Sequence, residues 1–320
     1  MRLLFFIALV VLAIALVACQ SAGAAPDSSA QVVQATGAMP TEIIETRPPD
    51  ATPVRTGPVA PSPTSTEGAT PSPAPSPSPD APSCLASGGR IDSHELTNDL
   101  SLLSWEFRVY TPPCYQEEGG RRYPLLILIH GQTYTDDQWD RLGVDETADR
   151  LISRGEIPAL IILMPRDRRW VDPPKDRFGE ALIGHVLPWV DENYRTLPER
   201  HFRAIGGLSR GASWAVHLGL SHWELFGSIG AHSLPVFWSD TPKARRMLEA
   251  VPAGSMPKIY LDIGEGDYLI ESAVWFESLL NELDIPHSWH LFAGKHEEAY
   301  WMRHIEEYLR WYTADWAQVE

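Results

Sequence analysis

The 320-residue sequence is poor in basic residues, has three cysteines, and includes a long stretch without aromatic residues. Lys and Arg number 26 against 42 Asp and Glu, a formal net charge of −16. This balance argues against a nucleic-acid partner, because duplex binding depends on basic residues that neutralise phosphates. Residues 20–83 contain no Phe, Trp or Tyr, and residues 26–83 hold 14 of the 28 prolines. A folded core is therefore excluded there, and residues 84–320 remain as one large domain.

Residues 1–19 have the pattern of an export signal. A single basic residue, Arg2, precedes an apolar run from Leu3 to Val17 that is short for a membrane-spanning helix. The run ends in Leu-Val-Ala-Cys, which resembles the lipobox of bacterial lipoproteins. We therefore expect a lipoprotein signal peptide, acylation of Cys19, and a protein anchored to the cell membrane by that lipid on the extracytoplasmic side. An ordinary cleaved signal peptide with a chance cysteine is the alternative.

Residues 20–83 have the composition of a disordered linker rich in Pro, Ser, Thr and Ala. The segment has almost nothing apolar to bury, so ordering it would lose conformational entropy without a compensating gain. Its prolines favour extended polyproline II conformation. We expect a passive spacer that separates the following domain from the membrane.

Residues 84–320 alternate short apolar runs with longer amphipathic ones, which indicates an α/β fold with a mostly parallel central sheet flanked by helices. The expected strands are 104–110, 125–130, 160–164, 202–206, 228–232, 259–263 and 288–292. In the last expected helix, one buried face is predicted from helical spacing. It comprises Trp301, Met302, Ile305, Tyr308, Leu309 and Tyr312.

Cys84 and Cys114 bracket the first expected strand. An even pair of cysteines in an exported chain favours a disulfide, because the compartment is oxidising. Closing the intervening loop stabilises the fold by about 3 to 4 kcal/mol on the chain-entropy estimate. We expect these two residues to be bridged rather than to be separate buried thiols.

The most informative segment is residues 201–220, where a short apolar run leads into Gly-Leu-Ser-Arg-Gly and then a helix rich in small residues. This is a G-x-S-x-G motif between a strand and a helix, the setting of a nucleophile elbow. Gly207 and Gly211 let the neighbouring chain pass close to a strained serine turn. Ser209 is therefore the predicted nucleophile, and a purely structural turn is the alternative.

A serine nucleophile needs a base, and a carboxylate to orient that base. Among the histidines that follow Ser209, His296 lies in a glycine-bearing loop directly after the last expected strand, and we assign it as the general base. His232, at the end of the strand after the elbow, is the reserve candidate. The remaining histidines after the serine lie on expected helices or beside a strand: His217, His222, His287, His290 and His304.

Three carboxylates compete for the role of the acid, namely Asp262, Glu265 and Asp267. Open α/β sheets place their sites at the carboxyl ends of the strands, and Asp267 lies beyond two glycines at such an end. Asp267 is therefore favoured, with Glu265 second. For the oxyanion hole we expect two backbone N–H donors, from Arg210 after the nucleophile and from Gln132 after the central strand.

Several segments together resemble the esterase family of the α/β-hydrolase superfamily that contains S-formylglutathione hydrolases, feruloyl esterases, enterochelin esterases and mycolyltransferases. The resemblance covers nearly all of residues 104–316. It rests on VYTPPCY (109–115), YPLLILIHG (123–131), LPWVDENYRT (187–196), AIGGLSRGA (204–212), the turn at 264–267 and AGKHEEAYW (293–301).

The resemblance implies a Ser209–His296–Asp267 triad with Gln132 and Arg210 as oxyanion donors. One departure is Arg210-Gly211-Ala212, where members of the family often have Met-Gly-Gly. The charged Arg210 side chain is expected either to alter the acyl pocket or to attract an anionic substrate. A second departure is the lipoprotein leader, which argues against cytosolic formaldehyde detoxification.

We expect no cofactor and no metal site, since the paired histidines lack a convincing third ligand. Trp139, Trp170, Trp214 and Trp238 fall near strand ends or loops, and His232 lies at a strand end; Trp139, Trp214 and His232 are the candidates for a pocket lining.

The expected function is a serine carboxylesterase that acts on a small-molecule or carbohydrate-linked ester through an acyl-enzyme. An acyltransferase or a siderophore-ester hydrolase with the same triad is the alternative, and a catalytically inactive surface-binding module is the least favoured.

Overall fold

The computed structural model describes residues 83–97 and 104–316. The expected signal peptide, Cys19 and the linker up to residue 82 lie outside the described residues.

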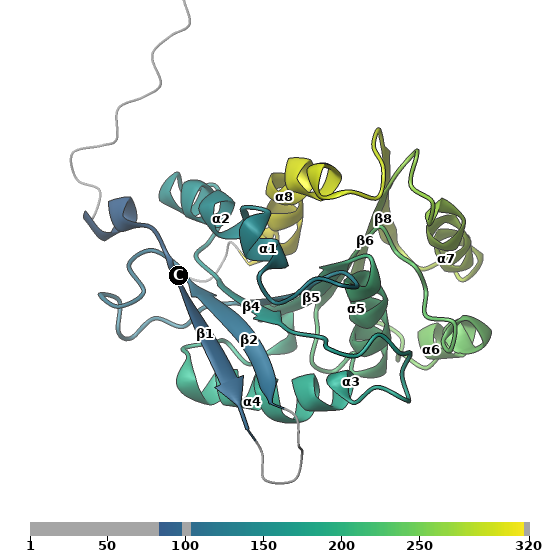
Figure 1. Ribbon diagram of the computed structural model, residues 1–320, viewed down its shortest axis with the longest axis horizontal. Coiled ribbons are helices and arrows are strands. Elements are labelled where there is room, and N and C mark those ends of the chain that lie inside the picture. Colours follow the sequence, from purple (N-terminus) through teal and green to yellow (C-terminus); the bar gives the residue numbers. More distant parts are fainter. Residues whose placement is uncertain (1–82, 98–103, 317–320) are drawn as a thin grey trace, which may run out of the picture. The chain divides into compact units, whose positions relative to one another are not determined.

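The described part is built on one eight-stranded sheet with the order β1-β2-β4-β3-β5-β6-β7-β8 (Figure 1). β1 pairs with β2, and β2 with β4, in antiparallel fashion, whereas all other neighbours are parallel. The strands are β1 (Arg90–Leu96), β2 (Trp105–Thr111), β3 (Leu125–Ile129), β4 (Ile161–Pro165), β5 (Arg203–Leu208), β6 (Ser228–His232), β7 (Lys258–Gly264) and β8 (His287–Phe292). The expected α/β fold with a mostly parallel sheet is confirmed.

All seven expected strands are present, with ends that differ by at most two residues. The strand that the sequence did not predict is β1, an edge strand with the sequence RIDSHEL whose side chains are all at least partly exposed. An edge strand needs no apolar run, because only one of its sides pairs with the sheet and its faces remain partly in water. The polar composition of β1 is therefore the reason that a search for apolar runs did not predict this strand.

Helices cover both faces of the sheet (Figure 1). Residues of α3 to α7 belong to the hydrophobic core on one face, and those of α1, α2 and α8 to the core on the other. The α-helices are α1 (Gln138–Arg141), α2 (Val144–Ser153), α3 (Phe178–Ala181), α4 (Leu187–Asn193), α5 (Arg210–Ser221), α6 (Ala244–Glu249), α7 (Ile270–Glu282) and α8 (Glu298–Thr313). The shorter helical segments are η1 (Ser83–Ser87), η2 (Leu182–Val186), η3 (Arg200–Phe202) and η4 (Thr241–Lys243).

The central strand β3 is apolar at every position because both of its faces are buried. Leu125, Ile127 and Ile129 pack into the core with α3 to α7, and Leu126 and Leu128 into the core with α1, α2 and α8. Side chains alternate between the faces of a strand, so both sets of positions in β3 meet an apolar core.

The buried face of α8 was predicted correctly except at one position. Trp301 and the four residues that follow it at helical spacing are buried, whereas Met302 is 52% exposed. Met302 lies about 100° of helical rotation from Trp301, at the edge of the buried face, where its side chain is in contact with solvent.

Cys84 and Cys114 form a disulfide with a Cα–Cα distance of 5.0 Å, as the sequence predicted. The bond joins η1, which precedes β1, to the turn that follows β2. It thereby fastens the antiparallel edge of the sheet at the start of the described domain.

Candidate active site

Ser209 lies at the tight turn between β5 and α5, with φ 52° and ψ −125°. A non-glycine residue pays a steric cost in this region, and such strain is typical of nucleophile elbows. The two flanking glycines are required by close packing. A Cβ atom on Gly207 would lie 2.4 Å from the backbone of Gly211, and one on Gly211 would lie 2.1 Å from the carbonyl oxygen of Ile129.

His296 lies in the loop between β8 and α8, and this loop brings its ring to the serine. Nε2 of His296 is 2.9 Å from Oγ of Ser209. Nδ1 is 2.9 Å from Oδ2 and 3.1 Å from Oδ1 of Asp267. A neutral imidazole that donates from Nδ1 to the carboxylate presents the lone pair of Nε2 to the serine hydroxyl, so the ring can accept the serine proton.

The carboxyl group of Asp267 is buried, with the residue 2% exposed. Burial opposes its ionisation, yet hydrogen bonds outweigh burial and hold the pKa of Asp267 below its ordinary value. The donors are the His296 ring, the Leu269 N–H at 2.9 Å from Oδ1, and the Ser233 hydroxyl. The carboxylate is thus kept charged beside the imidazole, where it stabilises an imidazolium.

The competing candidates occupy other positions. Glu265 is exposed at the turn after β7. Asp262 is buried behind the elbow, where it accepts hydrogen bonds from Nδ1 of His232 at 2.6 Å and from two tyrosine hydroxyls. His232 is fully buried and its two ring nitrogens contact Asp262 and the Tyr312 hydroxyl, not the Ser209 hydroxyl. Its carbonyl oxygen accepts the Ser209 N–H at 2.8 Å. The other histidines after the serine contact residues elsewhere: His217 with Asp240, His222 with Glu224, His287 with Glu277, His290 with Tyr260, and His304 with Glu307.

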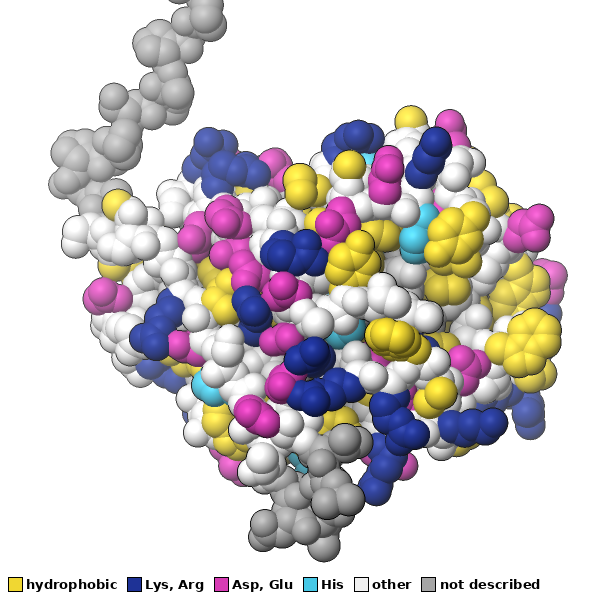
Figure 2. All heavy atoms as spheres, viewed as in Figure 1, with side chains coloured by type: hydrophobic (Ala, Val, Ile, Leu, Met, Phe, Trp, Pro, Cys, Tyr) yellow, Lys and Arg dark blue, Asp and Glu magenta, His cyan; other side chains and the backbone are white. Residues whose placement is uncertain are grey.

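A cavity of about 530 Å³ opens beside the serine and the histidine. Three aromatic side chains line it, namely Tyr134, Tyr268 and Trp301. Tyr134 and Tyr268 are 38% and 75% exposed, and the Trp301 ring lies edge-on to the His296 ring with centroids 5.0 Å apart. Figure 2 shows hydrophobic side chains gathered next to a histidine on the face between α1 and α7. The lining residues are Gly131, Gln132, Thr133, Tyr134, Leu208, Ser209, Arg210, Pro235, Tyr268, Leu269, His296, Glu297, Glu298 and Trp301.

Trp139, Trp214 and His232, expected as possible pocket residues, do not line this cavity. Both tryptophans are 1% exposed, and their indole N–H groups donate to the Ile129 carbonyl and the Asp167 carboxylate. They are core residues whose single polar group is satisfied internally. Tyr134 and Tyr268 were not predicted as cavity residues from the sequence. Both lie in loops, where no helical or strand periodicity indicates the direction of a side chain.

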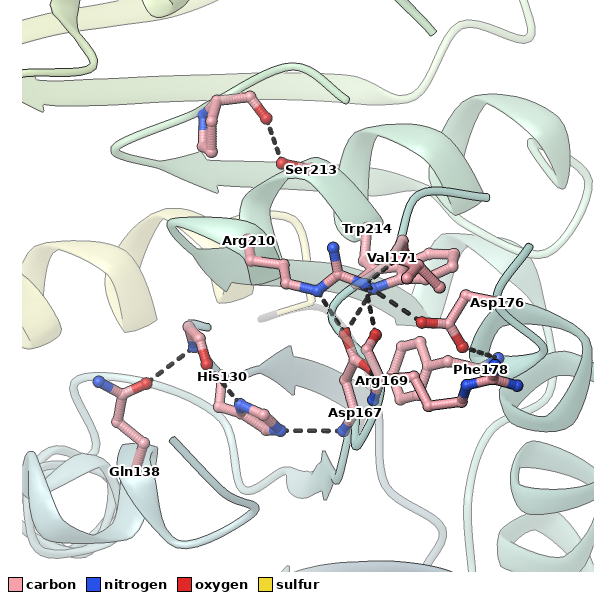
Figure 3. A network of polar contacts seen from close by, with 12 residues as sticks. His130, Gln138, Asp167, Arg169, Val171, Asp176, Phe178, Arg210, Ser213 and Trp214 are labelled. Atoms are coloured by element: carbon pink, nitrogen blue, oxygen red, sulfur yellow. Dashed lines mark hydrogen bonds and ion pairs between the residues drawn. The ribbon is translucent and has the colours of Figure 1, made fainter. Parts of the chain in front are cut away.

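Of the two expected oxyanion donors, Gln132 lines the cavity in the loop after β3, and Arg210 is the first residue of α5. Of the two roles expected for the Arg210 side chain, attraction of an anionic substrate is not supported, although Arg210 does line the cavity. Its guanidinium is buried and binds Asp167 at 2.7 Å and Asp176 at 3.2 Å (Figure 3). Because two carboxylates neutralise it, this cation is not free to attract an anionic substrate.

Within residues 83–97 and 104–316, no group of three or more His, Cys, Asp or Glu side chains is arranged to hold a metal ion. No helix in the same part of the chain is long and apolar enough to cross a membrane.

A mostly parallel eight-stranded sheet with a serine at the turn between β5 and α5 defines the class of α/β-hydrolase-fold esterases. The chain belongs to the esterase family described as "Putative esterase", whose model matches residues 104–312.

Two curated relatives share part of this sequence. Esterase Rv1288 of Mycobacterium tuberculosis is 32% identical over 148 residues, which are 42% of this chain and 30% of that protein. An endo-1,4-beta-xylanase/feruloyl esterase of Xylanibacter ruminicola is 31% identical over 117 residues, 34% of this chain and 16% of that protein. The matches therefore span less than a third of the length of either relative.

Solved structures share the fold. A ferulic acid esterase superposes with a TM-score of 0.65 at 21% identity, covering 71% of this chain and 99% of the other. S-formylglutathione hydrolase of Staphylococcus aureus superposes with a TM-score of 0.56 at 16% identity, covering 70% and 99%. At these identities the likeness establishes the fold alone.

Proposed function

We propose that this esterase is a serine carboxylesterase that works through an acyl-enzyme on Ser209 and is tethered outside the cytoplasm. The observation that carries the proposal is the 2.9 Å contact between Oγ of Ser209 and Nε2 of His296 beside an open cavity. A hydroxyl at this distance from a carboxylate-oriented imidazole is the arrangement that activates a serine.

In the first half of the reaction, Ser209 transfers its hydroxyl proton to Nε2 of His296 as Oγ attacks the ester carbonyl carbon. Asp267, held ionised, stabilises the resulting imidazolium. The carbonyl oxygen becomes an oxyanion that accepts hydrogen bonds from the backbone N–H groups of Gln132 and Arg210. The oxyanion then collapses, the imidazolium protonates the departing alcohol, and the acyl group remains on Ser209.

In the second half, a water molecule takes the place of the alcohol. His296 removes its proton as the water oxygen attacks the acyl carbonyl, and the same two N–H groups hold the second oxyanion. Collapse releases the carboxylic acid and returns the proton to Ser209, so the enzyme is regenerated without a net change of charge.

The cavity favours an ester with an uncharged or aromatic acyl group. Among the described residues that line it, Arg210 is the only Lys or Arg, and its charge is already paired. Exposed Glu297 adds negative charge at the opening, which repels carboxylates. Ferulate esters on carbohydrate are consistent with this lining, and two similar proteins are named as feruloyl or ferulic acid esterases.

Tethering through a lipid on Cys19, across the linker of residues 20–83, completes the proposal. It rests on the lipobox pattern and on the proline-rich composition, which lie outside the described residues. Membrane fractionation of a Cys19→Ser variant tests it, because loss of the lipid should release the protein. Unchanged membrane retention would exclude the lipid anchor.

Ser209→Ala tests the catalytic proposal. The purified variant should lose both hydrolysis of a short-chain nitrophenyl ester panel and labelling by a fluorophosphonate probe, while its circular dichroism stays that of the wild type. A folded variant that retained hydrolysis would refute the assignment. Adding alcohols as acceptors to the wild-type assay shows whether the acyl group passes to water or to another hydroxyl.

A further inference from the structure

Beside the triad lies a buried polar cluster that the proton-transfer steps do not use. Its centre is Asp167, which follows β4 and is 2% exposed. A carboxylate is rarely buried this deeply unless all its lone pairs are used, because desolvation of the charge is costly. Figure 3 shows that this residue lies between the loop after β3 and the start of α5.

Asp167 bonds to both of these segments. Its carboxylate oxygen Oδ2 accepts from Nε of Arg210 at 2.7 Å and from Nε1 of Trp214 at 2.9 Å. Its backbone N–H donates to Nε2 of His130 at 2.9 Å. One residue thus joins α5, which starts at one expected oxyanion donor, to the loop that carries the other.

In the loop after β3, the contact between Asp167 and His130 determines the direction of the Gln132 N–H group. Since Nε2 of His130 accepts from Asp167, the neutral ring carries its proton on Nδ1 and donates it to the carbonyl oxygen of Gly131 at 2.7 Å. Burial lowers the pKa of His130, which favours this neutral form. The peptide group that contains the Gly131 carbonyl also contains the N–H of Gln132, and a planar trans peptide points them in opposite directions. Holding the carbonyl therefore orients the N–H.

The N–H of Gly131 is held as well, by Oε1 of Gln138 at 2.8 Å. Two consecutive peptide groups of the loop are thereby fixed, so the Gln132 N–H cannot rotate without breaking the His130 contact.

On the side of α5, the Arg210 guanidinium fastens the first turn of the helix. Besides Asp167 it binds the carboxylate of Asp176 and the carbonyl oxygens of Arg169 and Val171, at 3.2, 2.9 and 2.7 Å. Nε faces Asp167 and Nη2 faces the other three oxygens, so the two N–H groups of Nη2 are shared among three acceptors; an apolar side chain could bind none of them. The position of the Arg210 backbone N–H is consequently tied to Asp167.

We infer that Asp167 is a positioning residue that sets the relative placement of the two oxyanion donors, the N–H groups of Gln132 and Arg210. The inference rests on the proposed function, because it concerns the oxyanion of that reaction. Preorganised donors stabilise the transition state more than the ground state, so a small displacement lowers kcat without weakening substrate binding.

The test is Asp167→Asn, which keeps the backbone N–H and the side-chain size but removes the charge that holds Arg210. For a nitrophenyl ester we expect kcat to fall by about 10- to 100-fold, since complete loss of one oxyanion donor costs about 100- to 1,000-fold. The KM should change less than about twofold, and the inhibition constant of a trifluoromethyl ketone, which forms a tetrahedral oxyanion on the serine, should rise by the same factor as kcat falls.

Asp240→Asn is the matched control. Asp240 is also a buried carboxylate and binds His217 of the same helix at 2.7 Å, but this contact lies far along α5 from its first residue. The control should lower the urea midpoint while leaving the trifluoromethyl ketone constant unchanged. If Asp167→Asn behaves like the control, Asp167 supports only the fold and the inference is wrong.

Arg210→Lys provides a second variant if Asp167→Asn does not fold. Lysine keeps the positive charge but lacks the planar set of donors, so kcat and the inhibition constant should move in the same directions. No change in either constant would overturn the inference. Labelling with a fluorophosphonate separates the two proposals. If the catalytic proposal is wrong, the Ser209→Ala variant is labelled as well as the wild type. If only the positioning inference is wrong, labelling still requires Ser209.

Discussion

The hydroxyl group of Tyr312 lies 3.0 Å from Nε2 of His232, and this contact fastens the last helix to the centre of the sheet. His232 also binds Asp262 and stacks on Tyr308, with ring centroids 3.7 Å apart. Because His296 lies two residues before α8, the docking of this helix determines where the base is held. The buried cluster behind the elbow thus supports the site without contacting the cavity.

The Tyr312 hydroxyl packs directly against Gly206 of β5 and Gly230 of β6, which have no side chain to occupy its position. A Cβ atom on Gly230 would lie 1.8 Å from the hydroxyl oxygen. We expect Gly230→Ala to lower the free energy of unfolding by about 3 kcal/mol, the upper range for overpacking a core, as measured by urea denaturation. Gly184→Ala is the control, because a Cβ there meets nothing within 4 Å. Equal stability of wild type and Gly230→Ala would contradict the packing.

Asp267→Asn should reduce kcat by about 10³- to 10⁴-fold with little loss of folding, because an amide donor beside Nδ1 favours the wrong histidine tautomer. Steady-state kinetics with a nitrophenyl ester measure the effect. Glu265→Gln is the control, since Glu265 is exposed at the same turn and should leave kcat within about twofold. If Glu265→Gln were the more damaging variant, the acid would have been assigned to the wrong carboxylate.

Replacement of Cys84 and Cys114 by serine should lower the free energy of unfolding by about 3 to 4 kcal/mol, because the open chain gains entropy when unfolded. Urea denaturation of the double variant measures this difference. Dithiothreitol should shift the wild-type midpoint in the same direction and leave the variant unaffected. Equal midpoints for the oxidised wild type and the variant would show that the bridge does not stabilise the domain.

The pKa of Asp176 is raised to about 6, first by burial and then by the charge of Asp167. A carboxyl group with a raised pKa binds its proton more tightly in the folded state. Its stabilising contribution is therefore complete below the ordinary pKa of 3.8 and is lost as the pH rises through about 6. We expect the stability of the wild type relative to Asp176→Asn to fall between pH 4.5 and about 7 in urea denaturation. A difference that stays constant over that interval would contradict the raised pKa.

Local sequence patterns were sufficient for much of the fold. Short apolar, β-rich runs predicted seven of the eight strands, and β3 is apolar at every position because both of its faces are buried. The edge strand β1 was missed because its partly exposed positions are mostly polar and give no apolar run. Met302 was misplaced because it lies at the edge of the buried face of α8, where helical spacing alone does not separate buried from exposed side chains.

Part of the candidate active site could also be predicted from the sequence. Glycines on both sides of Ser209, and a histidine in a loop directly after a strand, are constraints that act within a few residues. The choice of Asp267 over Asp262 followed from the position of each along its strand, and the structure places only Asp267 beside His296.

The sequence by itself determined the elements and the residue types available for catalysis, because strand and helix periodicity and the turn at the serine are short-range effects. Only the tertiary structure decided which side chains meet. Asp167 lies 37 residues from His130, and its charge pairs with Arg210, 43 residues away. Contacts across such distances arise when crossover connections bring the carboxyl ends of parallel strands to one edge of the sheet, so no local pattern could predict that a lone arginine after the serine is neutralised beneath the site.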